Sequence, residues 1–280
     1  MGARIILVIA LSSMTLTKPL SKLDLQWMGT LQKPWTLSTE DVSKILPQFH
    51  GRFPSFHDRL KAFSLWQVGK PYEASKLGEE IAPDLDPIIR LDVSDCTVHV
   101  LTSVAFAQSF TWEEARDKMI KIHYKDEKPS YETRWHFTSD RIQDNPYTVN
   151  ITENLIDEIH LEKIELILNQ KKDGEEFLDL GWKKRITVNF IPSKKINEQL
   201  LSNLPSVCGI AFVKKTYSKM GILIAHEGML VDQKNLIHAS SEFNETVNTN
   251  FINYYFRNDA PIFDGIMIYK FAPLKEPVQN

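Results

Sequence analysis

The sequence predicts an α+β fold, with helices packed on a mainly antiparallel sheet. The first half of the chain carries helix caps and apolar residues at helical spacing, whereas the second half consists mainly of short β-type apolar runs. Helices followed by a run of neighbouring strands are typical of the α+β class. The chain has 280 residues, 42% of them hydrophobic, so it is long enough to bury the core that such a fold needs.

Four helices are expected in the first half of the chain. Serine caps begin helices at 38–46 and 55–68, and the first of these should end before Pro47. The strongly apolar run 97–109 forms the third helix. A capping box, Thr-Trp-Glu-Glu, begins the fourth helix at 111–122.

The second half of the chain predicts strands that two short helices interrupt. The expected strands are 186–191, 207–213, 220–225, 229–238 and 265–271. The short helices are expected at 196–201 and 250–256. Between the two halves, segment 159–182 has a charge pattern that is typical of an exposed excursion or of the rim of a site.

The N-terminus has the pattern of a secretory signal. Arg4 precedes the continuous apolar run 5–11, and small polar residues follow it. This run is shorter than the ~20 apolar residues that span a bilayer, and no later segment reaches that length. An ordinary N-terminal strand is the alternative. We predict an exported protein with a signal peptide at 1–17, a helical extension at 18–54 and one catalytic domain at 55–280.

Net charge and cysteine content indicate which partners and which cysteine chemistry to expect. The net charge is -3, the pI is about 6.3 and the lysines are scattered, so a nucleic-acid partner is not expected. The two cysteines, Cys96 and Cys208, could form one disulfide in an exported protein. If Cys96 is instead a nucleophile, it stays a thiol and Cys208 is a buried spectator.

Cys96 stands where a helix would activate a thiol. It follows Ser94 and Asp95, which are cap-type residues, and it opens the apolar helix 97–109. The positive end of the helix dipole and the unpaired N–H groups there favour a thiolate, and they would also bind a developing oxyanion. The alternative is an ordinary core cysteine on an apolar helix.

His238 closes the apolar run 229–238 and precedes small residues. A histidine at this place is either a satisfied core residue or the imidazole partner of a cysteine nucleophile. Metal binding by His226, His238 and His136 is not favoured, because no H-x-x-x-H or H-E-x-x-H spacing and no matching pair of cysteines is present.

Five short motifs stand in order along the chain. They are Gly-Lys-Pro-Tyr at 69–72, Ser-Asp-Cys-Thr at 94–97, Tyr-Glu-Thr-Arg-Trp-His-Phe-Thr-Ser-Asp at 131–140, Met-Gly-Ile-Leu-Ile at 220–224 and Ile-His-Ala-Ser-Ser at 237–241. Together they resemble the papain-like cell-wall hydrolases of the NlpC/P60 class. The third motif resembles that of the DUF1460 branch, also called the N-acetylmuramoyl-L-alanine amidase-like family. The resemblance covers most of the chain, roughly from Ser55 to Phe271.

The resemblance implies a papain-like fold and hydrolysis of the amide between N-acetylmuramic acid and L-alanine. Its substrates would be peptidoglycan fragments, the anhydro-muropeptides, in the bacterial periplasm or cell envelope. It implies that Cys96 is the nucleophile and that His238 is the third, polar member that orients the base. Tyr72 would lie beside the cysteine, and Asp95 would help to shape the pocket. Neither a metal nor an organic cofactor is needed.

The branch-specific motif contributes two more candidate site residues. Arg134 and His136 would contact the substrate if the resemblance extends to their roles. The alternative is structural, since an ion pair between Arg134 and Asp140 would simply tie down a loop.

The position of the base departs from the family pattern. The resemblance implies a His-x-Gly base at the start of a strand, and Lys219-Met220-Gly221 occupies those positions here. Presenting lysine neutral at pH 7 costs about 4.6 kcal/mol, although its cation could still stabilise a thiolate. His226 is rejected as a substitute. Seven residues along the same strand correspond to ~23 Å, and the odd spacing turns the side chain to the opposite face.

Three hypotheses follow. The first is an active cysteine amidase that uses Cys96 and His238, with Lys219 in an unusual supporting role. The second is a pseudoenzyme, a muropeptide-binding module on the same fold. The third, which the spacing of the histidines disfavours, is an unrelated metal-dependent hydrolase.

Overall fold

The computed structural model describes residues 19–273 and contains an eight-stranded antiparallel sheet. The strand order is β2-β3-β10-β4-β5-β6-β7, and β1 pairs with β10. The strands of this sheet are β1 (Thr148–Asn150), β2 (Glu162–Leu168), β3 (Lys184–Pro192), β4 (Val207–Val213), β5 (Ile224–Val231), β6 (Asn235–Ser240), β7 (Glu245–Asn250) and β10 (Gly265–Phe271). A separate short hairpin joins β8 (Phe256–Arg257) to β9 (Ala260–Pro261).

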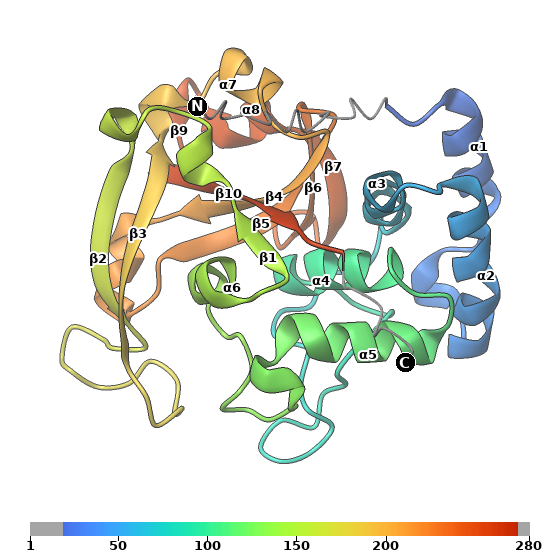
Figure 1. Cartoon of the computed structure of the whole chain (residues 1–280), viewed down its shortest axis with the longest axis horizontal. Helices are drawn as coiled ribbons and strands as arrows, with labels where there is room; N and C mark the ends of the chain where they lie inside the picture. Colours follow the sequence, from blue (N-terminus) through green and yellow to red (C-terminus); the bar gives the residue numbers. More distant parts are fainter. Residues whose placement is uncertain (1–18, 274–280) are drawn as a thin grey trace, which may run out of the picture.

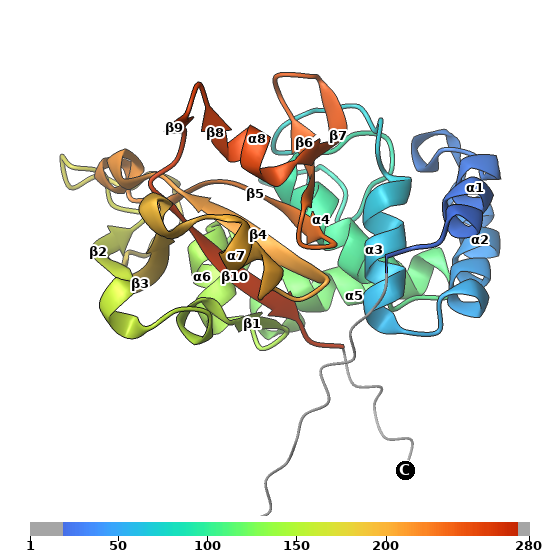
Figure 2. The same ribbon diagram turned by 90° about the horizontal axis from the view of Figure 1, so that it is seen from above.

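Helices cover both faces of the sheet, which confirms the predicted α+β class (Figures 1 and 2). One face carries α3 (Phe56–Trp66), α4 (Cys96–Phe106), α5 (Trp112–His123) and α6 (Thr138–Asp144), and the other carries α7 (Glu198–Ser202) and α8 (Phe251–Tyr255). At the end of the molecule away from β2 lie α1 (Lys22–Thr30) and α2 (Thr39–Arg52). In residues 19–273, no helix has the length and apolarity that a membrane span requires.

The sheet separates two hydrophobic cores, and β4 contributes to both. Val207 and Ala211 point into the larger core below α3, α4 and α5, whereas Cys208, Ile210 and Phe212 point into the smaller core below α7 and α8. Successive side chains of a strand alternate between faces, so a central strand with a core on each side is apolar throughout. Cys208 is therefore buried, and both cysteines are free thiols.

The predicted domain boundaries stay predictions. The predicted ends of the helices, in contrast, can be compared with the structure. The signal peptide at 1–17 lies outside the described residues. The expected end of α2 before Pro47 is wrong, because the helix continues beyond it. The buried side of α2 includes Leu46 and Phe49, on either side of the proline. Their packing offsets the loss of the one backbone hydrogen bond that proline cannot donate.

Two strand predictions, 220–225 and 229–238, are wrong in position. A 3-10 helix (Lys215–Met220) ends at the first residue of the predicted strand 220–225, and β5 begins only at Ile224. The second run is broken between β5 and β6 at Asp232 and Gln233, whose φ angles are 52° and 59°. This turn contains neither glycine nor proline, so the apolar run appeared continuous in the sequence.

The segment 159–182 contains a strand that the sequence did not reveal. β2 pairs along its length with β3 at one edge of the sheet. An edge strand is often charged on its exposed side, because charges there discourage pairing with other chains. The charged residues of segment 159–182 therefore belong partly to the edge strand β2 and partly to the loop that follows it.

Candidate active site

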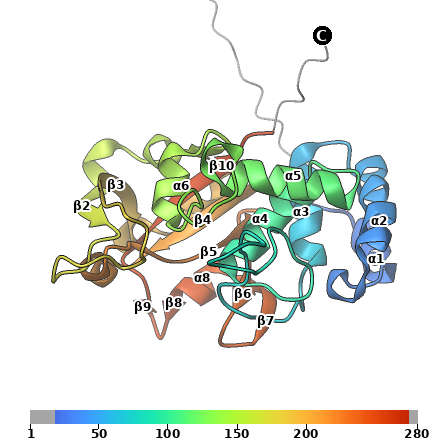
Figure 3. The ribbon, with the colours of Figure 1, turned by 90° about the horizontal axis from the view of Figure 1, so that it is seen from below.

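Cys96 is the first residue of α4, and Asp95 is the residue that fixes this helix start. One carboxylate oxygen of Asp95 accepts the backbone N–H of Val98 at 2.8 Å, as an N-cap does. The other accepts the N–H of Ser75 at 2.8 Å. Asp95 thus ties the start of α4 to Ser75, in the segment that precedes the helix and lies across it near the β6–β7 hairpin (Figure 3).

The surroundings of Cys96 keep it as a thiol at neutral pH. Burial, followed by the negative charges of Asp95 and Glu227, raises the pKa of the Cys96 thiol to about 12. The backbone N–H of Glu227 lowers this pKa, but it does not compensate. The expectation that the helix start favours a thiolate is therefore wrong, because burial and two acidic side chains raise the pKa of this thiol.

His226 and His238 are hydrogen-bonded to each other. Nε2 of His226 lies 2.8 Å from Nδ1 of His238, and the ring centroids are 4.9 Å apart at an interplanar angle of 79°. The two residues lie on the neighbouring strands β5 and β6. A shift of the β4–β5 register between Phe212 and Val213 falls beside His226, and such irregularities re-aim side chains next to active sites.

Gly228 leaves the space that this histidine pair needs. A Cβ atom on Gly228 would stand 2.9 Å from Cβ of His238 and 2.9 Å from the carbonyl oxygen of Ile237. Any side chain at this position would therefore push His238 away from His226. The His-x-Gly triplet of the site is accordingly His226-Glu227-Gly228, and its glycine serves the second histidine.

The expectation that His226 lies far from the site is wrong. It assumed one continuous strand from Lys219 onward, whereas the chain forms a 3-10 helix up to Met220 and starts β5 at Ile224. The missed signal was present in the sequence, because His226-Glu227-Gly228 fits the His-x-Gly pattern directly.

Lys219 lies elsewhere on the surface. It is exposed and lines a shallow hollow with Lys171, Lys172, Asp173 and Met220. Gly221 ends the 3-10 helix in the left-handed region at φ 75°, and a Cβ there would stand 2.3 Å from the backbone nitrogen of Gln170. Within residues 19–273, Lys219 has no hydrogen bond, ion pair or ring contact with Cys96 or His238, so the structure does not bring it to the histidine pair.

Both imidazoles are neutral at pH 7. Burial, followed by the charge of His238, lowers the pKa of His226 to about 3. Burial is also the first cause that lowers the pKa of His238 to about 4, and the nearby Arg257 adds to it. In a neutral pair, one ring nitrogen donates the shared hydrogen bond and the other accepts it.

Two tyrosines border the site. The ring of Tyr254 on α8 lies 4.5 Å from the ring of His238 and 6.1 Å from that of His226. Tyr72 lies close to Cys96, since burial and then the charge of Cys96 raise the pKa of Tyr72, and its hydroxyl pairs with Ser241. The chain thus brings Cys96, Tyr72, His226 and His238 together at the junction of α4, β5, β6 and α8.

Arg134 and His136 are engaged away from Cys96. Arg134 is buried and donates to both carboxylate oxygens of Glu79 at 2.7 and 2.9 Å, to Asp84 at 2.8 Å and to the carbonyl of Leu77 at 2.6 Å. It therefore ties down the 77–84 loop, and Asp140 is not its partner. Nε2 of His136 lies 2.6 Å from the carbonyl oxygen of Tyr131, which holds the ring within its own loop.

Asp140 pairs with lysines instead. Its carboxylate bonds Lys184 at 2.5 Å and lies 3.3 Å from Lys125. The predicted ion pair between Arg134 and Asp140 is thus wrong in its partner, although the structural role suggested for Arg134 fits. The buried guanidinium of Arg134 is paired with the carboxylates of Glu79 and Asp84, so its charge and its donors are satisfied without a ligand.

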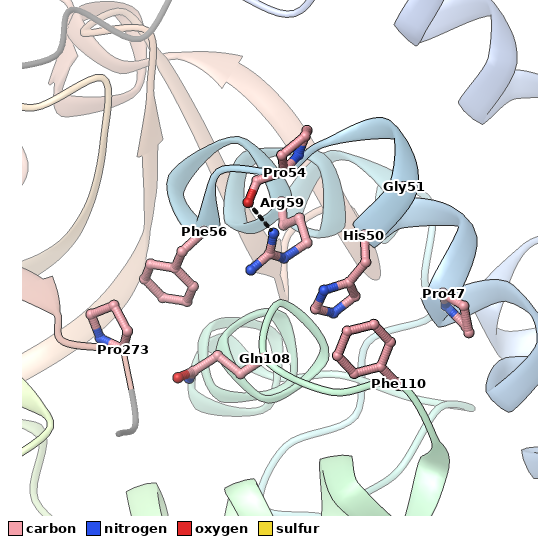
Figure 4. A pocket seen from close by; sticks show the side chains of 9 residues that line it. All are labelled: Pro47, His50, Gly51, Pro54, Phe56, Arg59, Gln108, Phe110 and Pro273. Atoms are coloured by element: carbon pink, nitrogen blue, oxygen red, sulfur yellow. Dashed lines mark hydrogen bonds between the residues drawn. The ribbon is translucent and has the colours of Figure 1, made fainter. Parts of the chain in front are cut away.

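A separate hollow lies at the other end of α4 (Figure 4). Its volume is about 620 Å³, and Arg59, Gln108 and Phe110 are among the residues that line it. An 11-residue helix is ~16 Å long, so this hollow is separated from Cys96 by the length of α4. The reactive side chains, rather than this hollow, mark the candidate active site.

Comparisons with known proteins identify the family and the fold of this chain. A family model described as AmiA-like, N-acetylmuramoyl-L-alanine amidase-like, matches residues 62–262. A DUF1460 protein of known structure from Legionella pneumophila is 22% identical, with a TM-score of 0.68 over 84% of this chain and 95% of that one. An N-acetylmuramoyl-L-alanine amidase from Bacteroides uniformis is 20% identical, with a TM-score of 0.61 over 78% of this chain and 99% of that one. A search of curated proteins found no match.

Proposed function

Because the chain belongs to the N-acetylmuramoyl-L-alanine amidase-like family, we propose that it cleaves the amide between N-acetylmuramic acid and L-alanine by cysteine catalysis. Cys96 is the nucleophile, His226 the general base and His238 the residue that orients the base. The observation that carries this proposal is the 2.8 Å contact between Nε2 of His226 and Nδ1 of His238, beside a cysteine that opens a helix.

The proton inventory of the histidine pair fits this assignment. A neutral His226 that donates from Nε2 to Nδ1 of His238 keeps its own Nδ1 as an acceptor for the thiol proton. His238 then carries its proton on Nε2, which is buried and has no hydrogen-bond partner among the described residues. When His226 becomes an imidazolium, its bond to His238 helps to stabilise the new charge.

In the first half-reaction, Sγ of Cys96 attacks the lactyl carbonyl carbon while its proton passes to His226. A thiol with a pKa of about 12 is not ionised beforehand, so proton transfer accompanies the attack. The oxyanion is stabilised by backbone N–H groups at the start of α4, including that of Cys96 itself. The C–N bond then breaks, and the imidazolium returns its proton to the leaving L-alanine amine.

In the second half-reaction, water hydrolyses the thioester and restores the thiol. His226 takes a proton from the attacking water and delivers it to the departing sulfur. This cycle uses no metal and no organic cofactor. Residues 19–273 also contain no cluster of three or more His, Cys, Asp or Glu side chains suited to hold a metal ion.

The binding-module alternative rested on a lysine in place of the base. Since Lys219 is exposed on a different part of the surface, that reason no longer applies. We therefore do not favour a pseudoenzyme. The proposed substrates are anhydro-muropeptides, and the proposed location is the periplasm or cell envelope, reached through the signal peptide at 1–17.

The decisive experiment incubates the purified protein with anhydro-muropeptides and follows release of the L-alanine-containing peptide by mass spectrometry. The wild type should release it, and Cys96→Ala should not. Cys208→Ala, which removes the buried spectator thiol, is the matched control and should retain activity. Absence of peptide release by a folded wild-type protein would contradict the proposed function.

A further inference from the structure

Glu227 on β5 is fully buried, and four donors from three other elements bind its carboxylate. Oε1 accepts the hydroxyl of Thr97 on α4 at 2.9 Å and that of Thr138 on α6 at 3.3 Å. Oε2 accepts from Arg141 on α6 at 2.5 Å and from the hydroxyl of Tyr269 on β10. A buried carboxylate is tolerated only when its charge and lone pairs are satisfied in this manner.

The surrounding structure is built to hold this network. Arg141 and Glu227 form an ion pair with side-chain exposures of 1% and 0%, and the guanidinium also lies 5.8 Å from the centre of the Tyr269 ring. Gly209 on β4 leaves room for that ring, since a Cβ there would stand 2.2 Å from two of its atoms. Removing Arg141 would leave the buried carboxylate of Glu227 without its counter-ion, so the arrangement depends on this ion pair.

The network contains the sequence neighbours of both candidate catalytic residues, Cys96 and His226. Thr97 follows Cys96 directly on α4, whereas Glu227 follows His226 directly on β5. The hydrogen bond between Thr97 and Glu227 thus links the helix that carries the nucleophile to the strand that carries the base. A shift of a fraction of an ångström at this link would change the distance between Sγ and the imidazole.

We propose that Glu227 is a positioning residue, which holds Cys96 in register with His226 through its hydrogen bond to Thr97. This inference rests on the proposed function for its catalytic meaning, whereas the geometry and the charge of the network do not depend on it. The same carboxylate also opposes ionisation of the nearby thiol.

The sign of the charge effect follows from the groups that face the thiol. Cys96 is faced by the acidic side chains of Asp95 and Glu227 and by the tyrosines Tyr72 and Tyr254. The proposed base His226 is neutral at pH 7 and adds no charge, and Arg141 balances only the charge of Glu227. Both carboxylates raise the pKa of Cys96. Neutralising Glu227 should therefore lower that pKa, and the unpaired Arg141 cation should lower it further.

The first test is a matched pair of near-isosteric variants, Thr97→Val and Thr138→Val. Each removes one hydroxyl donor to the same carboxylate oxygen, but only Thr97 is next to the nucleophile. We expect Thr97→Val to lower kcat by about tenfold or more with little change in KM, because no substrate contact is lost. Thr138→Val should stay within about twofold of the wild type, and Thr97→Ser should restore activity.

The second test measures the rate of Cys96 alkylation by iodoacetamide against pH, on a Cys208→Ala background. Glu227→Gln should move the midpoint of this profile to lower pH by about one unit or more. Melting temperatures of all variants show whether they fold. The Thr97 and Thr138 pair keeps the inference testable if Glu227→Gln does not fold.

Two results would overturn the inference. One is an equal loss of kcat in Thr97→Val and Thr138→Val, and the other is an unchanged alkylation midpoint in a folded Glu227→Gln protein. The proposed function fails separately, if the wild type releases no peptide. In that case the alkylation profile still decides whether Glu227 controls the thiol.

Discussion

Replacing His226 by asparagine should abolish most of the activity, whereas replacing Lys219 should not affect it. An asparagine amide can still donate a hydrogen bond to Nδ1 of His238, so the neighbouring side chains keep a partner. It cannot accept the proton of Cys96. The substitution therefore separates the orienting contact from proton transfer.

The expected magnitude follows from the two pKa values. His226, with a pKa of about 3, is deprotonated at pH 7 and so can accept a proton. Without a base, Cys96 must ionise by itself, and with its pKa at about 12 only ~1 thiol in 10⁵ is a thiolate at pH 7. Loss of general-base catalysis typically costs 10²–10⁴-fold, so kcat should fall by roughly this factor, or ~3–5 kcal/mol in the barrier.

The assay is peptide release from anhydro-muropeptides between pH 6 and 10. The residual rate of His226→Asn should rise about tenfold per pH unit, since it follows the thiolate fraction. Lys219→Ala and Lys219→His should both stay within about twofold of the wild type. The reasoning is refuted if His226→Asn keeps wild-type kcat, or if Lys219→Ala loses as much activity as His226→Asn.

Three further predictions follow from the same geometry. Gly228→Ala should displace His238 and lower kcat by about tenfold or more, whereas Gly29→Ala, which has open space and lies in a helix, should be neutral or slightly stabilising in turnover and melting assays. Burial lowers the pKa of both site imidazoles, so the unfolded chain binds more protons than the folded chain below pH ~6.5. The free energy of unfolding, measured by chemical denaturation, should therefore fall as the pH drops from ~6.5 towards ~4. A rise in this free energy over the same window would contradict the assignment. Arg134→Met should destabilise the fold by about 3–5 kcal/mol, because it leaves the buried carboxylate of Glu79 unpaired, and an unchanged melting temperature would exclude this role.

The sequence carried the fold class and much of the element order, because these depend on local signals. The caps Ser38, Asp95 and Thr111 mark helix starts directly, and all three accept backbone N–H groups in the structure. The strands β4 and β10 were predicted over their whole length, since apolar residues on both faces make a central strand conspicuous. The place of Cys96 followed from its cap for the same reason.

Other features depend on distant partners, so the sequence could not reveal them. Arg134 finds Glu79 and Asp84, which lie about fifty residues earlier in the chain, and nothing local distinguishes them from Asp140. The pKa of Cys96 likewise depends on Glu227, which the sheet brings close to the start of α4. Charge and burial at a site are properties of the assembled fold, and a helix dipole alone was a poor guide to them.

The confusion between Lys219 and His226 shows what a His-x-Gly pattern means physically. Two glycines, Gly221 and Gly228, each follow a candidate base at the same spacing. Gly221 adopts a positive φ and ends a 3-10 helix, so its missing side chain serves the backbone. Gly228 lies in an extended strand, and its missing Cβ leaves the space that His238 occupies. A glycine is therefore evidence for the base only when a second imidazole needs its space, and by that criterion His226 is the candidate base.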